Sequence, residues 1–154
     1  SYEYPEAEVA FDSFLIGSGK VMNAEVEAEL VAAGYTKDEF LLATDTAMVI
    51  PVNNNIVVQL VGADVIHGWM MPALGVHSSA VPGRLNEVWF NADREGVYFG
   101  QCSALCGKDH AYMPITVKVV SQAAYDAWLE KAKGGDVVLS ATEASAPLTV
   151  AAAD

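Results

Sequence analysis

The twelve residues from Cys102 to Met113 constrain the fold of this chain more than any other segment. They carry two thiols, one imidazole and one thioether, on Cys102, Cys106, His110 and Met113, and the chain has no further cysteine. Thiolate and thioether sulfur favour copper(I), zinc or iron–sulfur clusters. Zinc, however, is bound by cysteine, histidine and carboxylate, so a methionine beside cysteine and histidine points to copper. Strand-like runs rich in β-branched and aromatic residues lie directly before and after the segment. We therefore expect a loop held between two paired strands, which leaves a metal site little freedom to deform.

The second thiol distinguishes two kinds of copper site. With one cysteine, a Cys…His…Met loop completed by an upstream histidine is the ligand set of a mononuclear blue copper protein. Two bridging thiolates, from Cys102 and Cys106, can hold two copper ions close together and let one electron spread over both. Two simpler alternatives are a disulfide between the cysteines and a zinc site built from the same residues. Neither alternative accounts for Met113, or for His67 in its own compact motif, Asp64–Pro72.

The length of 154 residues and the hydrophobic content of 53% predict one domain with a substantial core. We expect residues 1–133 to form this domain. Residues 134–154 lack periodicity and are expected to be a disordered tail. The chain contains no apolar run of about 18 residues, so no membrane span is expected. It also begins without a basic and apolar signal sequence, which predicts a mature product or a fragment.

Acidic residues dominate the charge of the chain. The formal net charge is −12, and the excess of acids over bases is largest within residues 1–45. A single dominant sign of charge argues against nucleic acid as a partner. It favours a basic partner, attracted at rates that fall as salt is added.

Short strand signals recur along the chain, separated by proline, glycine and asparagine. They predict an all-β, antiparallel sandwich or barrel with Greek-key connections. Two short helices are expected, one near 24–40 that includes a capping box at Thr36–Glu39, and one near 122–133. Ser121 is the expected cap of the second helix, and Trp128 lies on its buried stripe. The expected strands are Ala47–Val52, Ile56–Asp64, Asn86–Asn91, Gly96–Cys102 and Met113–Val120.

Several motifs together resemble subunit II of cytochrome c oxidase, in its extracytoplasmic copper domain. The resemblance covers about residues 1–130, and the spaced metal motif is its most specific part. An insertion at about 17–40 and the residues of the motifs are similar to those of the alphaproteobacterial branch of the family. The motifs that carry the resemblance are Ser1–Tyr4, Phe11–Phe14, Leu41–Asp45, Asp64–His67, Val81–Arg84, Gly96–Cys102 and Met113–Ile115.

The resemblance implies a cupredoxin-like fold that holds two copper ions in a dinuclear CuA centre. In such a centre two bridging thiolates link the metals, and each copper takes one imidazole. A thioether and a backbone carbonyl are the two weak ligands. The ligands implied for this chain are His67, Cys102, Ala104 through its backbone carbonyl, Cys106, His110 and Met113.

The resemblance further implies the electron-input subunit of a heme–copper oxidase. Electrons pass from cytochrome c to the copper centre and on to heme in subunit I, so the complex is an oxidoreductase. This chain alone would transfer electrons without reducing oxygen. It would face the periplasm, or the intermembrane space of a mitochondrion, with membrane contact only through upstream helices and other subunits. Acidic side chains would attract the lysine rim of cytochrome c, at Asp12, Asp64, Asp45, Glu8 and Glu3.

Two stretches depart from the pattern of the family. Ala104 stands where a glutamate is usual, and that glutamate helps to hold a magnesium or manganese ion at the subunit I interface. A methyl group cannot bind the ion, so this ion site is doubtful here. His77 and Ser79 stand where lysine and aspartate are usual. His77 is expected to be a surface or interface histidine without a role in copper binding.

Two other classes of protein remain open. Nitrous oxide reductase has a copper domain with a similar Cys…Cys…His…Met loop, but that domain follows a large propeller. A mononuclear cupredoxin, serving as an electron carrier or in copper delivery, would bind one copper and need only one of the two cysteines. Copper stoichiometry and the spin distribution of the bound copper separate these classes from the dinuclear centre.

Overall fold

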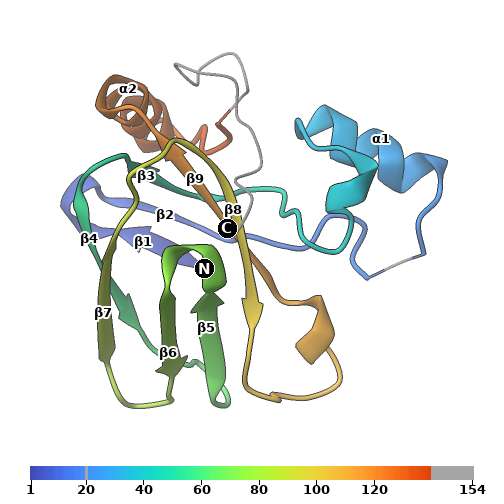
Figure 1. The fold of residues 1–154 in the computed structure, drawn as a ribbon, viewed down its shortest axis with the longest axis horizontal. Coiled ribbons are helices and arrows are strands. Elements are labelled where there is room, and N and C mark those ends of the chain that lie inside the picture. The colour runs from blue at the N-terminus through green and yellow to red at the C-terminus, as the bar shows by residue number, and fades with distance from the viewer. Residues whose placement is uncertain (20, 140–154) are drawn as a thin grey trace.

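The computed structural model describes residues 1–19 and 21–139. Most of the secondary structure is in strands (Figure 1), and the strands form one five-stranded sheet and two two-stranded sheets. The five-stranded sheet has the order β3-β9-β8-β5-β6, and the smaller sheets are β1-β2 and β4-β7. The strands are β1 (Tyr2–Tyr4), β2 (Val9–Phe11), β3 (Met48–Pro51), β4 (Asn55–Leu60), β5 (His67–Met71), β6 (Val76–Ala80), β7 (Asn86–Asn91), β8 (Gly96–Cys102) and β9 (Pro114–Val120).

Two α-helices and four short 3-10 turns complete the described part of the chain. The α-helices lie outside the sheets (Figure 1), with α2 at the end of the sheet opposite the β8–β9 loop. The helices are α1 (Ala24–Ala32) and α2 (Gln122–Lys133), and the 3-10 turns are Pro5–Ala7, Lys37–Glu39, Pro72–Leu74 and His110–Tyr112. None of the helices described is long and apolar enough to cross a membrane.

The all-β fold class is confirmed, but the expected antiparallel pairing is wrong in one place. Strands β3 and β9 pair in parallel, with Met48 opposite Val117 and Pro51 opposite Val120. Parallel neighbours need a long crossover connection, and here the connection is the whole segment from β4 to β8. The sheet is therefore mixed.

Four strands were not expected from the sequence. Strands β5 and β6 read His-Gly-Trp-Met-Met and Val-His-Ser-Ser-Ala, with only one β-branched aliphatic residue between them. They pair with each other, and β5 also pairs with β8 through Trp69 and Cys102. Strands β1 and β2 have three residues each, too few for a periodic signal.

The main core lies between the five-stranded sheet and the β4–β7 pair. Val117 and Val119 on β9 are fully buried, and Met71 on β5 is equally buried. Phe90 on β7 packs into the same cluster, with Ile56 of β4 packed against it. Burial of such large apolar side chains gives the sheet a rigid inner face, because packed interiors have few voids.

Helix α2 covers a second core cluster, as its apolar stripe predicts. Its N-cap is Ser121, whose Oγ accepts a hydrogen bond from the backbone N–H of Ala124 at 3.2 Å. Trp128 is buried, and its Nε1–H donates to the carbonyl of Val137 at 2.9 Å. Leu139 is buried in the same cluster, so packing continues through residues 134–139, where a disordered tail was expected. Residues 140–154 of that tail lie outside the described residues.

The segment expected to be an insertion folds over the outer face of β8. Asn23 caps α1 through a hydrogen bond from the backbone N–H of Val26 at 2.9 Å. Val26 and Leu30 are buried against Val97 of β8, while Tyr98 points into the main core. The capping box at Thr36–Glu39 is present as expected, and it begins one 3-10 turn.

Candidate metal centre

The loop between β8 and β9 begins and ends on paired strands. Cys102 is the last residue of β8, and its backbone N–H donates to the carbonyl of Met113 at 3.1 Å. His67 is the first residue of β5, the neighbour of β8 in the sheet. These strand ends bring a histidine 35 positions away in the sequence to the base of the loop.

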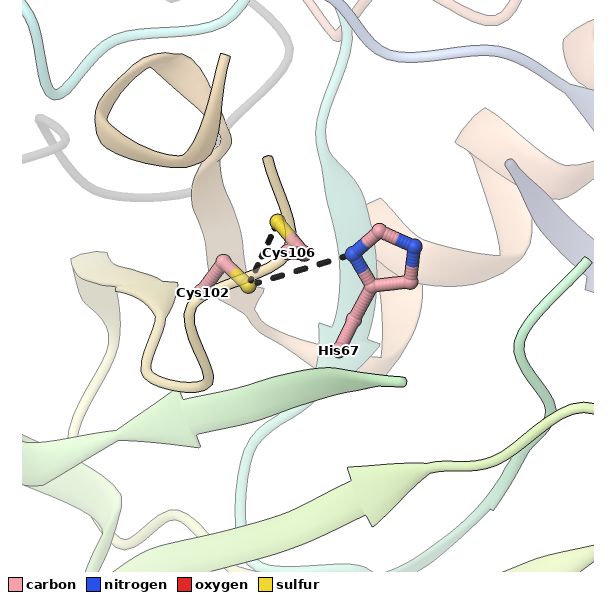
Figure 2. A group of neighbouring side chains, drawn as sticks. All are labelled: His67, Cys102 and Cys106. Carbon is pink, nitrogen blue, oxygen red and sulfur yellow. Dashed lines mark hydrogen bonds between the residues drawn. The ribbon is translucent and has the colours of Figure 1, made fainter. Parts of the chain in front are cut away.

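Three donor side chains converge at this point. The Sγ atoms of Cys102 and Cys106 are 3.7 Å apart, and Nδ1 of His67 is 4.0 Å from Sγ of Cys102. Figure 2 shows the imidazole of His67 and the two thiols turned toward one another. Their ligand atoms all lie within 4.8 Å of one another, a spacing that one metal ion can bridge. Both cysteines are free thiols, so the simple disulfide alternative does not describe this structure.

The remaining ligand candidates complete the ring around the thiols. Nδ1 of His110 lies 3.6 Å from Sγ of Cys106, and Sδ of Met113 lies 3.4 Å from the same sulfur. The carbonyl oxygen of Ala104 lies 3.3 Å from Sγ of Cys102. The structure therefore gathers two thiols, two imidazoles, one thioether and one carbonyl. This donor set suits copper, because soft sulfur and imidazole ligands predominate and methionine is among them.

The two thiols differ in their readiness to ionise. Burial works against ionisation of Cys102, but hydrogen bonds from the backbones of Gly68 and Ala104 and from both histidine rings outweigh it. They lower the pKa of Cys102 to about 7. Burial and the neighbouring Cys102 raise the pKa of Cys106, because a second thiolate so close to the first is repelled. A cation that binds both thiolates removes this repulsion, which is why such a pair favours metal binding.

Asp64 contacts the site in a way that the sequence reasoning missed. Its Oδ1 is 2.7 Å from Nε2 of His67, while Nδ1 of the same ring faces Cys102. The hydrogen bond with Asp64 raises the pKa of His67, although partial burial opposes the shift. A carboxylate on the outer nitrogen of a metal-binding histidine fixes the orientation of the ring. The Asp-x-x-His spacing was the available signal, but it becomes informative only once the turn before β5 is known.

The other acids expected to attract cytochrome c are exposed, but they do not form one cluster. Asp12 and Asp45 lie on neighbouring segments, because Thr46 Oγ1 donates to the carbonyl of Asp12 at 2.7 Å. Asp45 also caps the local turn, accepting backbone N–H groups of Phe14 and Thr46 at 2.7 and 2.8 Å. Both acids remain exposed at the surface.

Glu8 lies at the opposite end of the β1–β2 pair from Asp12. It lines a shallow surface hollow with Pro5 and Lys133, at the end of α2. Asp12 directly follows β2, and its carboxylate bonds the hydroxyl of Ser1. Glu3 lies between these ends, opposite Ala10 in the β1–β2 register. The structure thus separates Glu8 from the metal loop.

Fold and site together define a cupredoxin-like β domain in which a cluster of Cys, His and Met side chains could hold a metal ion. The family model described as "Cytochrome C oxidase subunit II, periplasmic domain" matches residues 1–120. This chain belongs to the cytochrome c oxidase subunit II family. The resemblance inferred from the sequence is therefore confirmed, and the family favours the oxidase over the two alternative classes.

Relatives and solved structures agree with this assignment. Cytochrome c oxidase subunit 2 of Cereibacter sphaeroides is 60% identical over an alignment of 154 residues. The match covers 97% of this chain and 51% of that protein. The mitochondrial subunit 2 of Vigna unguiculata is 42% identical over 135 residues, covering 84% of this chain and 32% of that protein. The chain spans about half the length of the Cereibacter relative and about a third of the length of the Vigna relative.

Two solved structures share the fold. The periplasmic domain of cytochrome oxidase subunit II from Bradyrhizobium japonicum matches with a TM-score of 0.70 and 43% identity, covering 86% of this chain and 83% of that one. A mixed-disulfide intermediate between a thioredoxin-like protein and subunit II of cytochrome c oxidase matches with a TM-score of 0.65 and 41% identity, covering 86% and 81%.

Proposed function

We propose that this domain binds two copper ions in a dinuclear centre and carries electrons one at a time. The observation that carries the proposal is the pair of thiols 3.7 Å apart, with an imidazole nitrogen beside each sulfur. A mononuclear blue copper site needs only one thiolate, whereas a dinuclear site would use both thiols as ligands. The proposed ligands are His67, Cys102, Ala104 through its carbonyl, Cys106, His110 and Met113.

The protein contributes rigidity to electron transfer at this site. A dinuclear copper centre held here would share one electron between two metals, so its bond lengths would change little on reduction. The ligand loop is held at both ends by β8 and β9, whose register runs from Gly96 opposite Val119 to Gln101 opposite Pro114. The partly exposed ring of His67 leaves the site close to the surface, where an electron donor can approach.

We propose further that the domain is the electron-input part of a cytochrome c oxidase. Electrons would arrive from cytochrome c and leave to heme in subunit I, at the periplasmic face of a membrane or its mitochondrial equivalent. Two properties support this role besides the family. The net charge of −12 attracts a basic donor. Exposed apolar side chains surround the loop, with Ile66 51% and Leu105 85% exposed, as expected where a partner excludes water.

Rapid mixing of the copper-loaded domain with reduced cytochrome c tests this role. The domain should take up electrons at a rate that falls steeply as salt is added, because opposite charges steer the encounter. Asp12→Asn and Asp45→Asn should each reduce the salt dependence without altering the copper spectrum, and Glu8→Gln should change neither. A rate that is independent of salt in the unmodified domain would rule out this docking mode.

A second proposed role concerns the metal-free state. One of the structural neighbours is described as a mixed disulfide with a thioredoxin-like protein. Here too the thiols are close, partly exposed, and unequal in pKa, which suits thiol–disulfide exchange. If Cys102 and Cys106 become oxidised to a disulfide, a thiolate of a thioredoxin-like dithiol would attack one sulfur and release the other as a thiolate. The second thiol of the reductant would then resolve the mixed disulfide, leaving both cysteines reduced and the reductant oxidised.

Mass spectrometry of the oxidised domain with a thioredoxin-like protein that keeps only its attacking cysteine tests this second role. The expected product is a trapped one-to-one covalent complex. An oxidised domain that stays unreacted while a generic disulfide peptide is attacked would exclude it.

A further inference from the structure

Gly68 on β5 lies directly against the metal loop. A Cβ atom placed on Gly68 would lie 2.1 Å from Oγ of Ser103, 2.9 Å from the backbone nitrogen of Ala104 and 3.1 Å from that of Ser103. Contacts shorter than about 3.0 Å do not occur for real Cβ atoms, so the absence of a side chain is required here by space. The hydroxyl of Ser103 occupies the volume that a methyl group would fill.

The backbone of Gly68 also binds the loop through hydrogen bonds. Its carbonyl accepts the backbone N–H of Ser103 at 3.0 Å. A hydrogen bond from its own backbone reaches the thiol of Cys102. Gly68 therefore contacts two successive residues of the loop, and one of them is a proposed copper ligand.

His77 holds the same serine from the neighbouring strand. Its Nε2 lies 2.8 Å from Oγ of Ser103, across the β5–β6 hairpin in which Met70 is opposite His77 and Gly68 is opposite Ser79. The hydroxyl of Ser103 is thus fixed between the Cα of Gly68 and the imidazole of His77. This contact gives His77 a structural partner, where the sequence predicted only a surface histidine.

We propose that Gly68, Ser103 and His77 are positioning residues that arrange the metal loop before copper binds. Ser103 lies between two proposed ligand groups, the thiol of Cys102 and the carbonyl of Ala104, which are already 3.3 Å apart. Fixing the backbone of Ser103 sets the direction of both groups at once. A loop that is already ordered loses less conformational entropy when a metal binds, so binding is tighter.

The inference rests on the proposed copper ligands, but its first test needs no metal. Amide hydrogen exchange of residues 103–106 is measured in the metal-free domain for His77→Ala, Ser103→Ala and the double variant. Each single change should accelerate exchange at Ser103 and Ala104 by roughly threefold to tenfold, the effect of losing one neutral hydrogen bond. The double variant should be no faster than Ser103→Ala, because both changes remove the same bond.

A conservative and a matched variant separate positioning from general stability. His77→Gln keeps a side-chain group that can bond Ser103, so it should restore part of the slow exchange. Ser79→Ala alters the same strand at a side chain that makes no hydrogen bond to the loop, and it should exchange like the unmodified domain. Unchanged exchange in both His77→Ala and Ser103→Ala, relative to Ser79→Ala, would overturn the proposal.

Gly68→Ala provides the strongest perturbation. It should displace Ser103 and shift the copper electron paramagnetic resonance spectrum, and Ser103→Ala in the same chain should partly reverse the shift by removing the Oγ contact. A Gly68→Ala spectrum identical to that of the unmodified domain would also overturn the proposal. If the unmodified domain binds only one copper, the dinuclear proposal fails, whereas the exchange result still decides whether Ser103 is held in place.

Discussion

Oδ1 of Asp64 lies 2.7 Å from Nε2 of His67, whose other ring nitrogen faces the thiol of Cys102. The carboxylate therefore touches the metal site from outside while remaining largely exposed to solvent, at 72%. Sequence reasoning assigned Asp64 to the docking of cytochrome c alone. We expect a second task for it, since the same contact would favour the tautomer of His67 that leaves Nδ1 free to bind a metal.

Asp64→Asn should therefore weaken copper binding as well as slow electron uptake. We expect about a tenfold loss of copper affinity, because the partner of a ligating histidine is removed without removing the ligand. Competition with a copper chelator measures the affinity. Asp12→Asn, an acid with no contact to a ligand, should leave it unchanged. Equal copper affinities for both variants and the unmodified domain would show that Asp64 acts only in docking.

Ala104 leads to a prediction for the intact oxidase. Magnesium and manganese prefer oxygen ligands, and the methyl group of Ala104 offers none. The oxidase that contains this chain should hold no such ion through subunit II, while Ala104→Glu should introduce manganese binding with the copper spectrum retained. Metal analysis and manganese resonance check both outcomes. A stoichiometric ion ligated by the unmodified subunit would contradict the prediction.

Lys118 should make the stability of the domain depend on pH. It is buried on β9, where its Nζ donates to the carbonyl of Leu139 at 3.3 Å and lies 5.2 Å from the ring centre of Tyr35. Burial lowers the pKa of Lys118 from 10.5 to about 8. Between these values the unfolded chain binds more protons than the folded one, so stability should rise with pH.

The comparison of unmodified protein with Lys118→Met isolates this effect. From pH 7.5 to 9.5 the free energy of unfolding should rise by about 2 kcal/mol more in the unmodified domain than in Lys118→Met. Above about pH 10 the free energy of unfolding should fall in both proteins, since burial raises the pKa of Tyr2 to about 12 and only the unfolded tyrosine ionises. Urea unfolding at each pH gives the free energies. Parallel pH profiles for the two proteins would refute the role of Lys118.

Local patterns predicted the parts of the fold whose signals are local. The strands around the metal loop were correct because β8 and β9 are rich in β-branched and aromatic residues and enclose a contiguous ligand set. Ser121 and Trp128 were correct because a cap and an apolar stripe define α2 within one segment. The mixed sheet was not predicted, because the parallel β3–β9 pair joins segments that lie far apart in the sequence.

The site shows the same division. Its proposed ligand side chains could be named from their chemistry and from the family resemblance, but the residues that hold them in place could not. The contact of Gly68 with Ser103 depends on a missing side chain, which no periodicity reveals. The separation of Glu8 from the loop depends on the direction of the β1–β2 pair, two strands too short to detect. Acidic composition predicts a partner of positive charge, and only the fold distinguishes the acids near the proposed metal site from the rest.

The dinuclear assignment is tested most directly by electron paramagnetic resonance of the copper-loaded domain, with copper and protein counted in the same sample. We expect two coppers per chain and a hyperfine pattern from one unpaired electron shared by two copper nuclei. Cys106→Ser should abolish the shared pattern, whereas Trp128→Phe should lower stability and leave the pattern intact. A hyperfine pattern from a single copper nucleus in fully loaded, unmodified protein would contradict the dinuclear assignment.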